Sequence, residues 1–225
     1  EYILRDRSRK KLVDLSLSAF TWVTSSESPA PGGGSVSAAM GALGAALGTM
    51  VANLSSHKRG WDDRWNEFAS WAEKGVEMQK RLLALVDEDT EAYNGIVKAF
   101  GMPKKSEEEK AARDAAVEAA TLHASVVPLT VMKEAFKVFE LLREMIVNGN
   151  PNSVTDGAVG VLAVRACIRG AFLNVRINVK ELKDRAKAAE LVSEASEIDR
   201  AAASMEEEVI PRVIKELAIE GEILE

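Results

Sequence analysis

One carboxylate stands on a helix face that should be buried. Between residues 61 and 100, apolar and small side chains recur at three- and four-residue steps, which predicts one long helix with a single inward face. The repeating residues are Phe68, Trp71, Gly75, Met78, Leu82, Val86, Tyr93, Ile96 and Phe100. Asp89 falls on the same face. Burial raises the pKa of a carboxyl group and so prepares it for proton transfer near neutral pH. Asp89 is therefore a candidate general acid and base; the competing interpretation is that it caps a neighbouring helix or pairs with Lys or Arg.

A stretch rich in proline and glycine leads into an uncharged segment. It begins at Pro29 and continues through Pro31, Gly32, Gly33, Gly34 and Ser35. Ser35 stands where a helix N-cap belongs. A bare loop that ends at a helix N-terminus offers unpaired N–H groups to an anionic or carbonyl oxygen. The stretch is a candidate ligand-binding loop, and the alternative is a plain loop-to-helix joint with a good cap.

A second polar loop follows residue 148. Gly149 fits a helix C-cap, and Ser153 with Asp156 has the spacing of a capping box. The loop also contains Asn150 and Asn152, which together with Asn148 exceed what a cap requires. Amides present both donors and acceptors to a heterocycle. A ligand contact and ordinary turn chemistry are both open here.

Two cations, Lys58 and Arg59, close the uncharged segment. Cations at a helix C-terminus complement the helix dipole and need no further role. They are also suited to hold a polyanionic substrate tail.

The remaining reactive side chains indicate structural roles. His123 is interpreted as a core histidine, because no second His, Cys or carboxylate stands at metal spacing around it, and no metal site is expected. Cys167 is the single cysteine and has apolar neighbours, which is typical of a packed thiol in a reducing compartment.

These residues must be positioned by helices, since no convincing strand alternation occurs and the predicted class is all-α. A charged lead-in over residues 1–11 precedes one helical domain over residues 12–225. A Ser106–Glu109 capping box is expected to restart the chain after residue 105, with a kink or break at Pro128 and a kink or end at Pro211. The expected helices cover residues 12–26, 36–55, 61–100, 107–127, 128–148, 157–179 and 183 onward.

The charge balance restricts the partners. A net charge of −6 and a pI near 5.2 argue against a nucleic-acid or anionic-membrane binder. No basic stretch followed by an apolar one opens the chain, so we expect no secretory signal and a cytoplasmic protein.

The segment between Glu27 and Lys58 contains no charge, which raises the question of a membrane span. Its richness in Ala, Gly and Ser, and a mean hydropathy of −0.07 for the chain, favour a buried central helix with close neighbours instead. The several apolar helices offer more surface than one small bundle hides, which favours a homodimer.

Three ordered motifs resemble one family. Residues 28–36, 85–93 and 149–156 are similar to the S-P-x-P-G-G-G-S-V, L-V-D-x-D-x-x-A-[FY] and G-N-x-N-S-x-x-D patterns of the formiminotransferase-cyclodeaminase C-terminal family. That family includes methenyltetrahydrofolate cyclohydrolases, and the likeness covers nearly the whole chain. A lysine-rich stretch of the family is represented here by residues 57–61, with only two cations retained.

The resemblance implies an all-helical homodimer that acts on tetrahydrofolates in one-carbon metabolism and histidine degradation. The implied activity is an ammonia lyase reaction, in which 5-formiminotetrahydrofolate closes to 5,10-methenyltetrahydrofolate and ammonia. The alternatives are hydrolysis of 5,10-methenyltetrahydrofolate to the 10-formyl compound and a non-catalytic helical dimerisation scaffold. The charged lead-in looks like the connector that follows a formiminotransferase domain, which would be a covalent or separate partner.

The resemblance also implies roles for individual residues. Asp89 falls on the family's catalytic aspartate, and no metal or redox cofactor is required. Lys58 or Arg59 would meet the carboxylates of a glutamate or polyglutamate tail. The residues expected to fix the pterin or the reacting bridge are Gly32, Gly33, Gly34, Ser35, Asn150, Asn152, Ser153 and Asp156.

Overall fold

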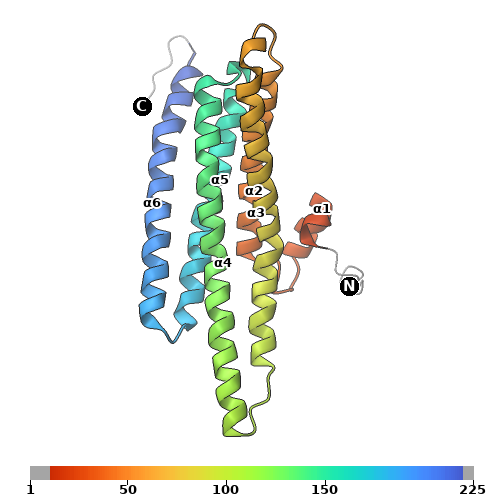
Figure 1. The fold of residues 1–225 in the computed structure, drawn as a ribbon, viewed down its shortest axis with the longest axis vertical. Helices are drawn as coiled ribbons and strands as arrows, with labels where there is room; N and C mark the ends of the chain where they lie inside the picture. The colour runs from red at the N-terminus through yellow and green to blue at the C-terminus, as the bar shows by residue number, and fades with distance from the viewer. Residues whose placement is uncertain (1–10, 220–225) are drawn as a thin grey trace.

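The computed structural model describes residues 11–219, and within that range it contains helices and no strand (Figure 1). The all-α prediction is confirmed. The α-helices are α1 (Leu17–Thr24), α2 (Gly33–Ser56), α3 (Trp65–Phe100), α4 (Glu107–Asn148), α5 (Val154–Asn178) and α6 (Arg185–Glu216). Short 3₁₀ turns lie at η2 (Leu12–Asp14), η3 (Asp62–Arg64), η4 (Pro151–Ser153) and η5 (Val179–Glu181). The expected lead-in falls almost wholly on residues 1–10, outside the described range.

The five long helices run side by side, and α1 lies beside them (Figure 1). Helix α2 packs against α3, α4 and α5, whereas α6 covers α5 and α4. Helices α3 and α4 continue beyond the ends of their neighbours towards the loop that joins them (Figure 1). The apolar seam of α6, which includes Leu191, Ala195, Ala202 and Val209, is buried against this bundle. The seam therefore serves the core of its own chain.

Close backbone approach explains the small residues of α2. A Cβ on Gly44 would lie 2.9 Å from the Gly160 carbonyl oxygen and 2.6 Å from a methyl carbon of Val164. Real Cβ atoms do not approach so closely, and the backbone of α5 cannot yield as a flexible side chain can. Glycine at this position thus lets α2 and α5 touch almost backbone to backbone.

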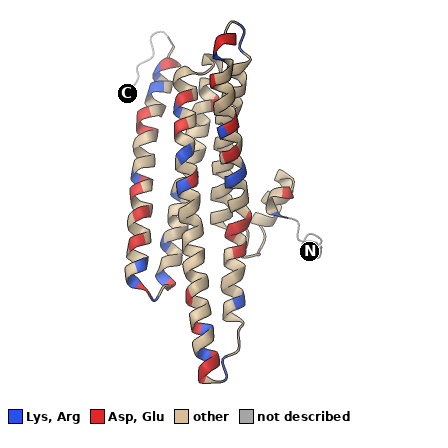
Figure 2. Cartoon of the chain, in the orientation of Figure 1, with Lys and Arg blue, Asp and Glu red and all other residues tan. Residues whose placement is uncertain are grey.

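Three helical segments are long and apolar enough to cross a membrane by length and composition: α2, α4 and the stretch Pro151–Glu181. The apolar window of α2 is 61% buried inside the bundle. Charged residues of both signs are distributed along α3, α4 and α6 (Figure 2).

Helix α4 corrects the expectation at Pro128. The helix runs without interruption from Glu107 to Asn148, with Pro128 buried inside it. Proline has no N–H for the carbonyl four residues earlier, which is that of Ala124. The side-chain amide of Asn178 donates to the Ala124 oxygen at 2.7 Å and replaces the missing bond. A residue distant in sequence therefore lets the helix continue.

Several local expectations were also wrong. Helix α6 continues past Pro211 to Glu216. The first helix is shorter than expected, because Ser16 accepts the Ala19 N–H and caps α1 at residue 17. His123 is exposed on α4 and is not a core residue. The Ser106–Glu109 capping box, by contrast, is confirmed with both of its hydrogen bonds.

Candidate active site

Asp89 meets the N-terminus of α2. Its Oδ2 accepts a hydrogen bond of 2.9 Å from the Ser35 hydroxyl, and the Ser35 N–H donates to the same carboxylate. The Ser35 hydroxyl also lies 3.2 Å from the Thr90 hydroxyl. A Cβ on Gly34 would overlap the Asp89 carboxylate. The glycine run thus lets the first turn of a helix close directly onto a carboxyl group.

The N-cap expected at Ser35 is wrong. Helix α2 begins at Gly33 with Gly32 as its N-cap, so Ser35 lies inside the first turn. Its hydroxyl and N–H are engaged with Asp89. Ser35 accordingly positions Asp89, the candidate acid and base. Asp89 in turn caps the N-terminus of α2, as the competing interpretation of its position proposed.

Burial raises the pKa of Asp89 above its ordinary value, although the two hydrogen bonds from Ser35 oppose the shift. No Lys or Arg within residues 11–219 forms an ion pair with it. A carboxyl group held in this way favours its protonated form more than a solvated one does. It is therefore better suited than a solvated carboxyl group to accept a proton and return it.

A cavity of about 110 Å³ opens beside Asp89. That volume is close to four water molecules, so the cavity fits a small reacting group and not a whole folate. The walls of the cavity are formed by helices α2, α3, α4 and α5 and by the loop that precedes α2. The lining residues are Pro29, Ala30, Gly32, Gly33, Gly34, Asp89, Tyr93, Ile96, Ala124, Asn174 and Asn178.

Asn174 and Asn178 were given no role from the sequence. Both lie on α5, four residues apart, and so share a face of that helix. The available signal was a pair of amides at helical spacing in a helix rich in small and apolar residues. Asn174 and Asn178 lie near Asp89 because α5 packs on α2 and α4, and a single sequence does not reveal this packing.

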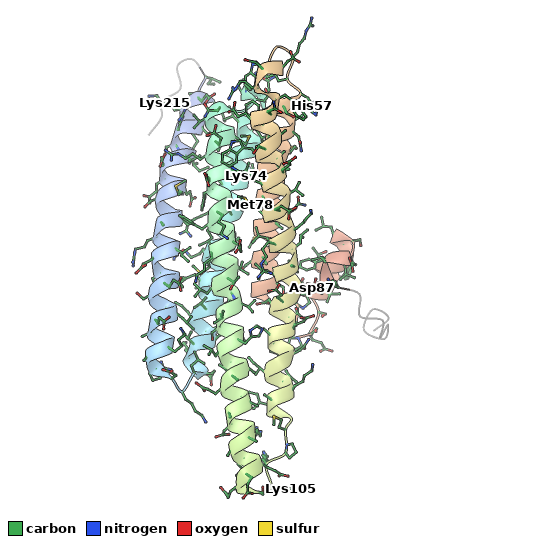
Figure 3. The ribbon with its side chains drawn as sticks, viewed as in Figure 1. His57, Lys74, Met78, Asp87, Lys105 and Lys215 are labelled. Carbon is green, nitrogen blue, oxygen red and sulfur yellow. The ribbon has the colours of Figure 1, made fainter. Side chains whose placement is uncertain are left out.

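The other expected site residues lie at the opposite end of α2. The Asn150 N–H donates to the Ser55 hydroxyl at 2.8 Å, whereas Asp89 contacts Gly34. The 21 residue-to-residue steps from Gly34 to Ser55 along α2 span about 32 Å at a rise of 1.5 Å each. In Figure 3 the labels of His57 and Asp87, neighbours in sequence of Lys58 and Asp89, are correspondingly far apart.

The residues of this second end differ in their local contacts. The Asn150 side chain accepts the Asn152 N–H and caps η4. Ser153 is buried at the N-cap of α5 but forms no side-chain cap bond, so the expected capping box with Asp156 is wrong. Asp156 is partly buried and Asn152 exposed.

The cation pair lies at this second end too. The Lys58 ammonium sits 4.1 Å from the centre of the Trp61 ring, while Arg59 is exposed. One chain therefore does not bring Lys58, Arg59 or the loop of residues 149–156 to Asp89.

A larger groove lies apart from Asp89. It has a volume of about 940 Å³ and is lined by residues that include His57, Lys74, Met78 and Arg81 (Figure 3). Two of its carboxylates, those of Glu77 and Glu134, pair with lysines on exposed helix surfaces. The groove is large enough for a ligand, but the group suited to proton transfer is in the smaller cavity. Residues 11–219 contain no cluster of three or more His, Cys, Asp or Glu side chains arranged to hold a metal ion.

The family model described as formiminotransferase-cyclodeaminase matches residues 16–197. The chain belongs to this family. A solved structure of formiminotetrahydrofolate cyclodeaminase from Thermotoga maritima superposes with a TM-score of 0.75 at 27% identity, covering 89% of this chain and 98% of that one.

Curated relatives in the family have two different names. The methenyltetrahydrofolate cyclohydrolase of Methylorubrum extorquens is 36% identical over 84% of this chain and 90% of its own length. The formimidoyltransferase-cyclodeaminase of Rattus norvegicus is 33% identical over 82% of this chain. The match spans only 34% of the rat protein's length. Membership of the family is thus consistent with either ring closure or hydrolysis at the one-carbon bridge.

Proposed function

We propose that the protein is a formiminotetrahydrofolate cyclodeaminase, which converts 5-formiminotetrahydrofolate to 5,10-methenyltetrahydrofolate and ammonia. The observation that carries the proposal is Asp89: a partly buried carboxyl group with a raised pKa, held by Ser35 at a helix N-terminus and facing a cavity. The Thermotoga maritima cyclodeaminase supports it, since it aligns over almost its whole length.

The reaction needs a proton to move between two nitrogens. N10 attacks the carbon of the protonated formimino group on N5, and the Asp89 carboxylate takes the proton from N10 as the C–N10 bond forms. Protonated Asp89 then gives that proton to the amino group of the tetrahedral intermediate, which leaves as ammonia. The methenyl cation remains, and charge and atoms balance. A positioned acid and base of this kind contributes about 10²–10⁴-fold to the rate.

The remaining residues at this end would hold the substrate. The N–H groups of Gly33 and Gly34 point out of the first turn of α2 and suit a carbonyl or anionic oxygen of the folate. The cavity then contains the reacting bridge, while the rest of the folate lies outside it. In this proposal no metal or redox cofactor takes part.

A homodimer would reunite the two ends of the site. Large apolar side chains are exposed on the adjoining helices α2 and α5: Leu43, Met50, Leu54, Val159, Leu162, Leu173 and Ile177. A second copy related by a twofold axis near the middle of α2 would cover this face with its own α2 antiparallel. Its Lys58, Arg59, Asn150, Asn152 and Asp156 would then approach Asp89 of the first copy, where the cations suit a glutamate tail.

The cellular context is part of the same proposal. A cytoplasmic enzyme fits a buried, unpaired Cys167 thiol, whose pKa burial raises to about 12. A formiminotransferase, attached or separate, would supply the formimino substrate, as the name of the rat relative suggests.

Hydrolysis of 5,10-methenyltetrahydrofolate is the second candidate. The cyclohydrolase of Methylorubrum extorquens favours it, because its match to this chain is as extensive as that of the cyclodeaminases. The same carboxyl group would then activate a water molecule at the bridge carbon.

Progress curves in the near ultraviolet separate these candidates. Purified protein is given 5-formiminotetrahydrofolate while the methenyl chromophore and ammonia are followed, and a parallel run follows the loss of 5,10-methenyltetrahydrofolate. Accelerated appearance of the chromophore with ammonia, abolished by Asp89→Asn, supports the cyclodeaminase. Accelerated loss without formimino turnover identifies the cyclohydrolase. No change in the rate of either reaction, together with no folate binding, would support the non-catalytic helical scaffold.

A further inference from the structure

The amides of Asn174 and Asn178 have a fixed orientation in the Asp89 cavity. The Asn174 Nδ2 donates to the Gly170 carbonyl oxygen at 2.9 Å, and the Asn178 Nδ2 donates to that of Ala124 at 2.7 Å. A carbonyl oxygen accepts but cannot donate, so these bonds decide which end of each amide is the nitrogen. Within residues 11–219 no group donates to either Oδ1. Each side chain therefore has one acceptor left for a ligand.

The first two residues of α2 lie next to Asn174 and Asp89, respectively. A Cβ on Gly33 would lie 3.3 Å from the Asn174 Nδ2, and one on Gly34 would overlap Asp89. Two consecutive glycines thus hold an amide and a carboxyl group on either side of one helix turn. The lining of the cavity includes three residues that carry an acceptor oxygen, namely Asp89, Asn174 and Asn178.

A set of acceptors recognises a group that donates hydrogen bonds, and a cationic one above all. The formimino group on N5 is an amidine, whose terminal nitrogen carries N–H donors. The formyl group has nearly the same shape but ends in an oxygen, which these acceptors would repel. When the formyl compound binds, these oxygens would receive no hydrogen bond, and leaving buried acceptors unpaired makes the preference for the formimino compound strong.

We propose that Asn174 and Asn178 are specificity-determining residues, whose side-chain oxygens accept hydrogen bonds from the N–H groups of the formimino nitrogen. The inference rests on the proposed function and deepens it. It also favours ring closure over hydrolysis, because the methenyl bridge of the cyclohydrolase substrate has no N–H for these oxygens to accept.

The test compares two folates that differ at that one atom, 5-formiminotetrahydrofolate and 5-formyltetrahydrofolate. Asn174→Leu removes the acceptor at similar volume, and Asn174→Asp keeps an oxygen in its place. Asn178 is left unchanged because its nitrogen also serves Ala124. The matched control is Asn94→Leu, which removes an exposed amide of α3 that does not line the cavity.

The readout is the ratio of the inhibition constant of the formyl compound to the KM of the formimino compound. We expect a ratio of about ten or more in the wild type, a roughly tenfold fall in Asn174→Leu through a higher KM, and no change in Asn94→Leu. Asn174→Asp should keep the wild-type preference. A ratio that stays the same in Asn174→Leu, or two constants that rise together, would overturn the inference, because the amide would then contact a part common to both folates.

Failure of the proposed function is a separate result. If the wild type turns over neither folate, the proposed cyclodeaminase activity is refuted, and the two dissociation constants can be measured directly by calorimetry. Their ratio, and its response to Asn174→Leu, then decides whether these acceptors select the amidine.

Discussion

The Asn178 side chain donates a hydrogen bond of 2.7 Å to the Ala124 carbonyl oxygen, the acceptor that Pro128 has no N–H to serve. This contact joins α5 to the middle of α4 and stands at the wall of the Asp89 cavity. The proline therefore both frees a carbonyl and fixes the orientation of an amide that faces the site.

The coupling between these residues is measurable. Asn178→Ala should lower the free energy of unfolding by about 1–3 kcal/mol, because it leaves a buried carbonyl without a donor. In a Pro128→Ala background the backbone N–H can serve Ala124, so the same substitution should cost less than half as much. Urea denaturation of the four proteins of this double-mutant cycle gives the interaction energy. Additive effects would show that the amide does not replace the proline's missing bond.

Asp89→Asn should lower kcat by about 10²–10⁴-fold. In the wild type, the acidic limb of kcat/KM against pH should lie above the ordinary carboxyl pKa of 3.8, because burial raises the pKa of Asp89. The limb should disappear from the residual activity of the variant. Full activity in Asp89→Asn would remove this residue from the mechanism.

The same substitution should not destabilise the protein at neutral pH. A carboxyl group whose pKa is higher in the folded chain favours folding below its unfolded pKa, and that contribution is lost as the pH rises through the folded pKa. Asp89 is ionised above that range and then opposes folding. We expect Asp89→Asn to unfold at the same or higher temperature than the wild type at pH 7, with no advantage below about pH 4. Calorimetric melting across this pH range checks the sign.

Gly34 and Gly95 form a matched pair for the close approach at the site. Gly34→Ala places a methyl group into the Asp89 carboxylate, so kcat should fall nearly as far as in Asp89→Asn and stability by about 1–3 kcal/mol. A Cβ on Gly95, further along α3, meets nothing within 4 Å. Gly95→Ala should leave kcat unchanged and stabilise the helix by up to about 1 kcal/mol. Equal activity in the two variants would contradict the packing role of Gly34.

The period of α3 was enough to single out Asp89, because one polar residue on a buried face stands out without any knowledge of its neighbours. To predict where the loop at residues 149–156 lies relative to Asp89, one must know the lengths of the helices. Gly34 and Asp89 lie at similar distances from the turn between α2 and α3, about 33 Å and 36 Å along their helices. The expected break at Pro128 hid the fact that an unbroken α4 carries the following loop away from them.

Other features depend on tertiary contacts that no local pattern contains. The exposure of His123 follows from which faces of α4 find neighbours. Asp199 is a clear example: this carboxylate of α6 is only 5% exposed, whereas its apolar neighbour Ile198 is only partly buried. Two arginines of α5, Arg165 and Arg169, contact it at 2.7 and 2.9 Å and decide that outcome.

This buried ion pair predicts a large effect of removing one partner. Asp199→Ala leaves the nearly buried Arg165 with Glu206, at 3.3 Å, as its one remaining carboxylate partner and should cost up to about 3–5 kcal/mol in urea unfolding. Replacing both residues by apolar ones, Arg165→Met with Asp199→Leu, should recover most of the loss. The exposed pair of Glu107 and Lys110 is the control, since its removal should change stability by less than about 1 kcal/mol.

The last prediction concerns the proposed homodimer, in which the two ends of α2 from different copies would form one site. If each site combines Asp89 of one copy with the loop of the other, neither Asp89→Asn nor the double variant Asn152→Ala, Asp156→Ala should be active alone. Mixed and allowed to exchange subunits in equal amounts, they should recover roughly a quarter of the wild-type activity, because half of the dimers are mixed and each has one intact site.

Leu43→Glu supplies the independent control for that experiment. The substitution puts a charge at the exposed middle of α2, where Leu43 is 61% exposed in one chain. It should yield a monomer by sedimentation that remains helical but has lost activity, although Asp89 is untouched. Recovery on mixing would be absent if each chain held a complete site. An active monomer would contradict the shared site as well, and would require the folate tail to be bound by residues near Asp89 of the same chain.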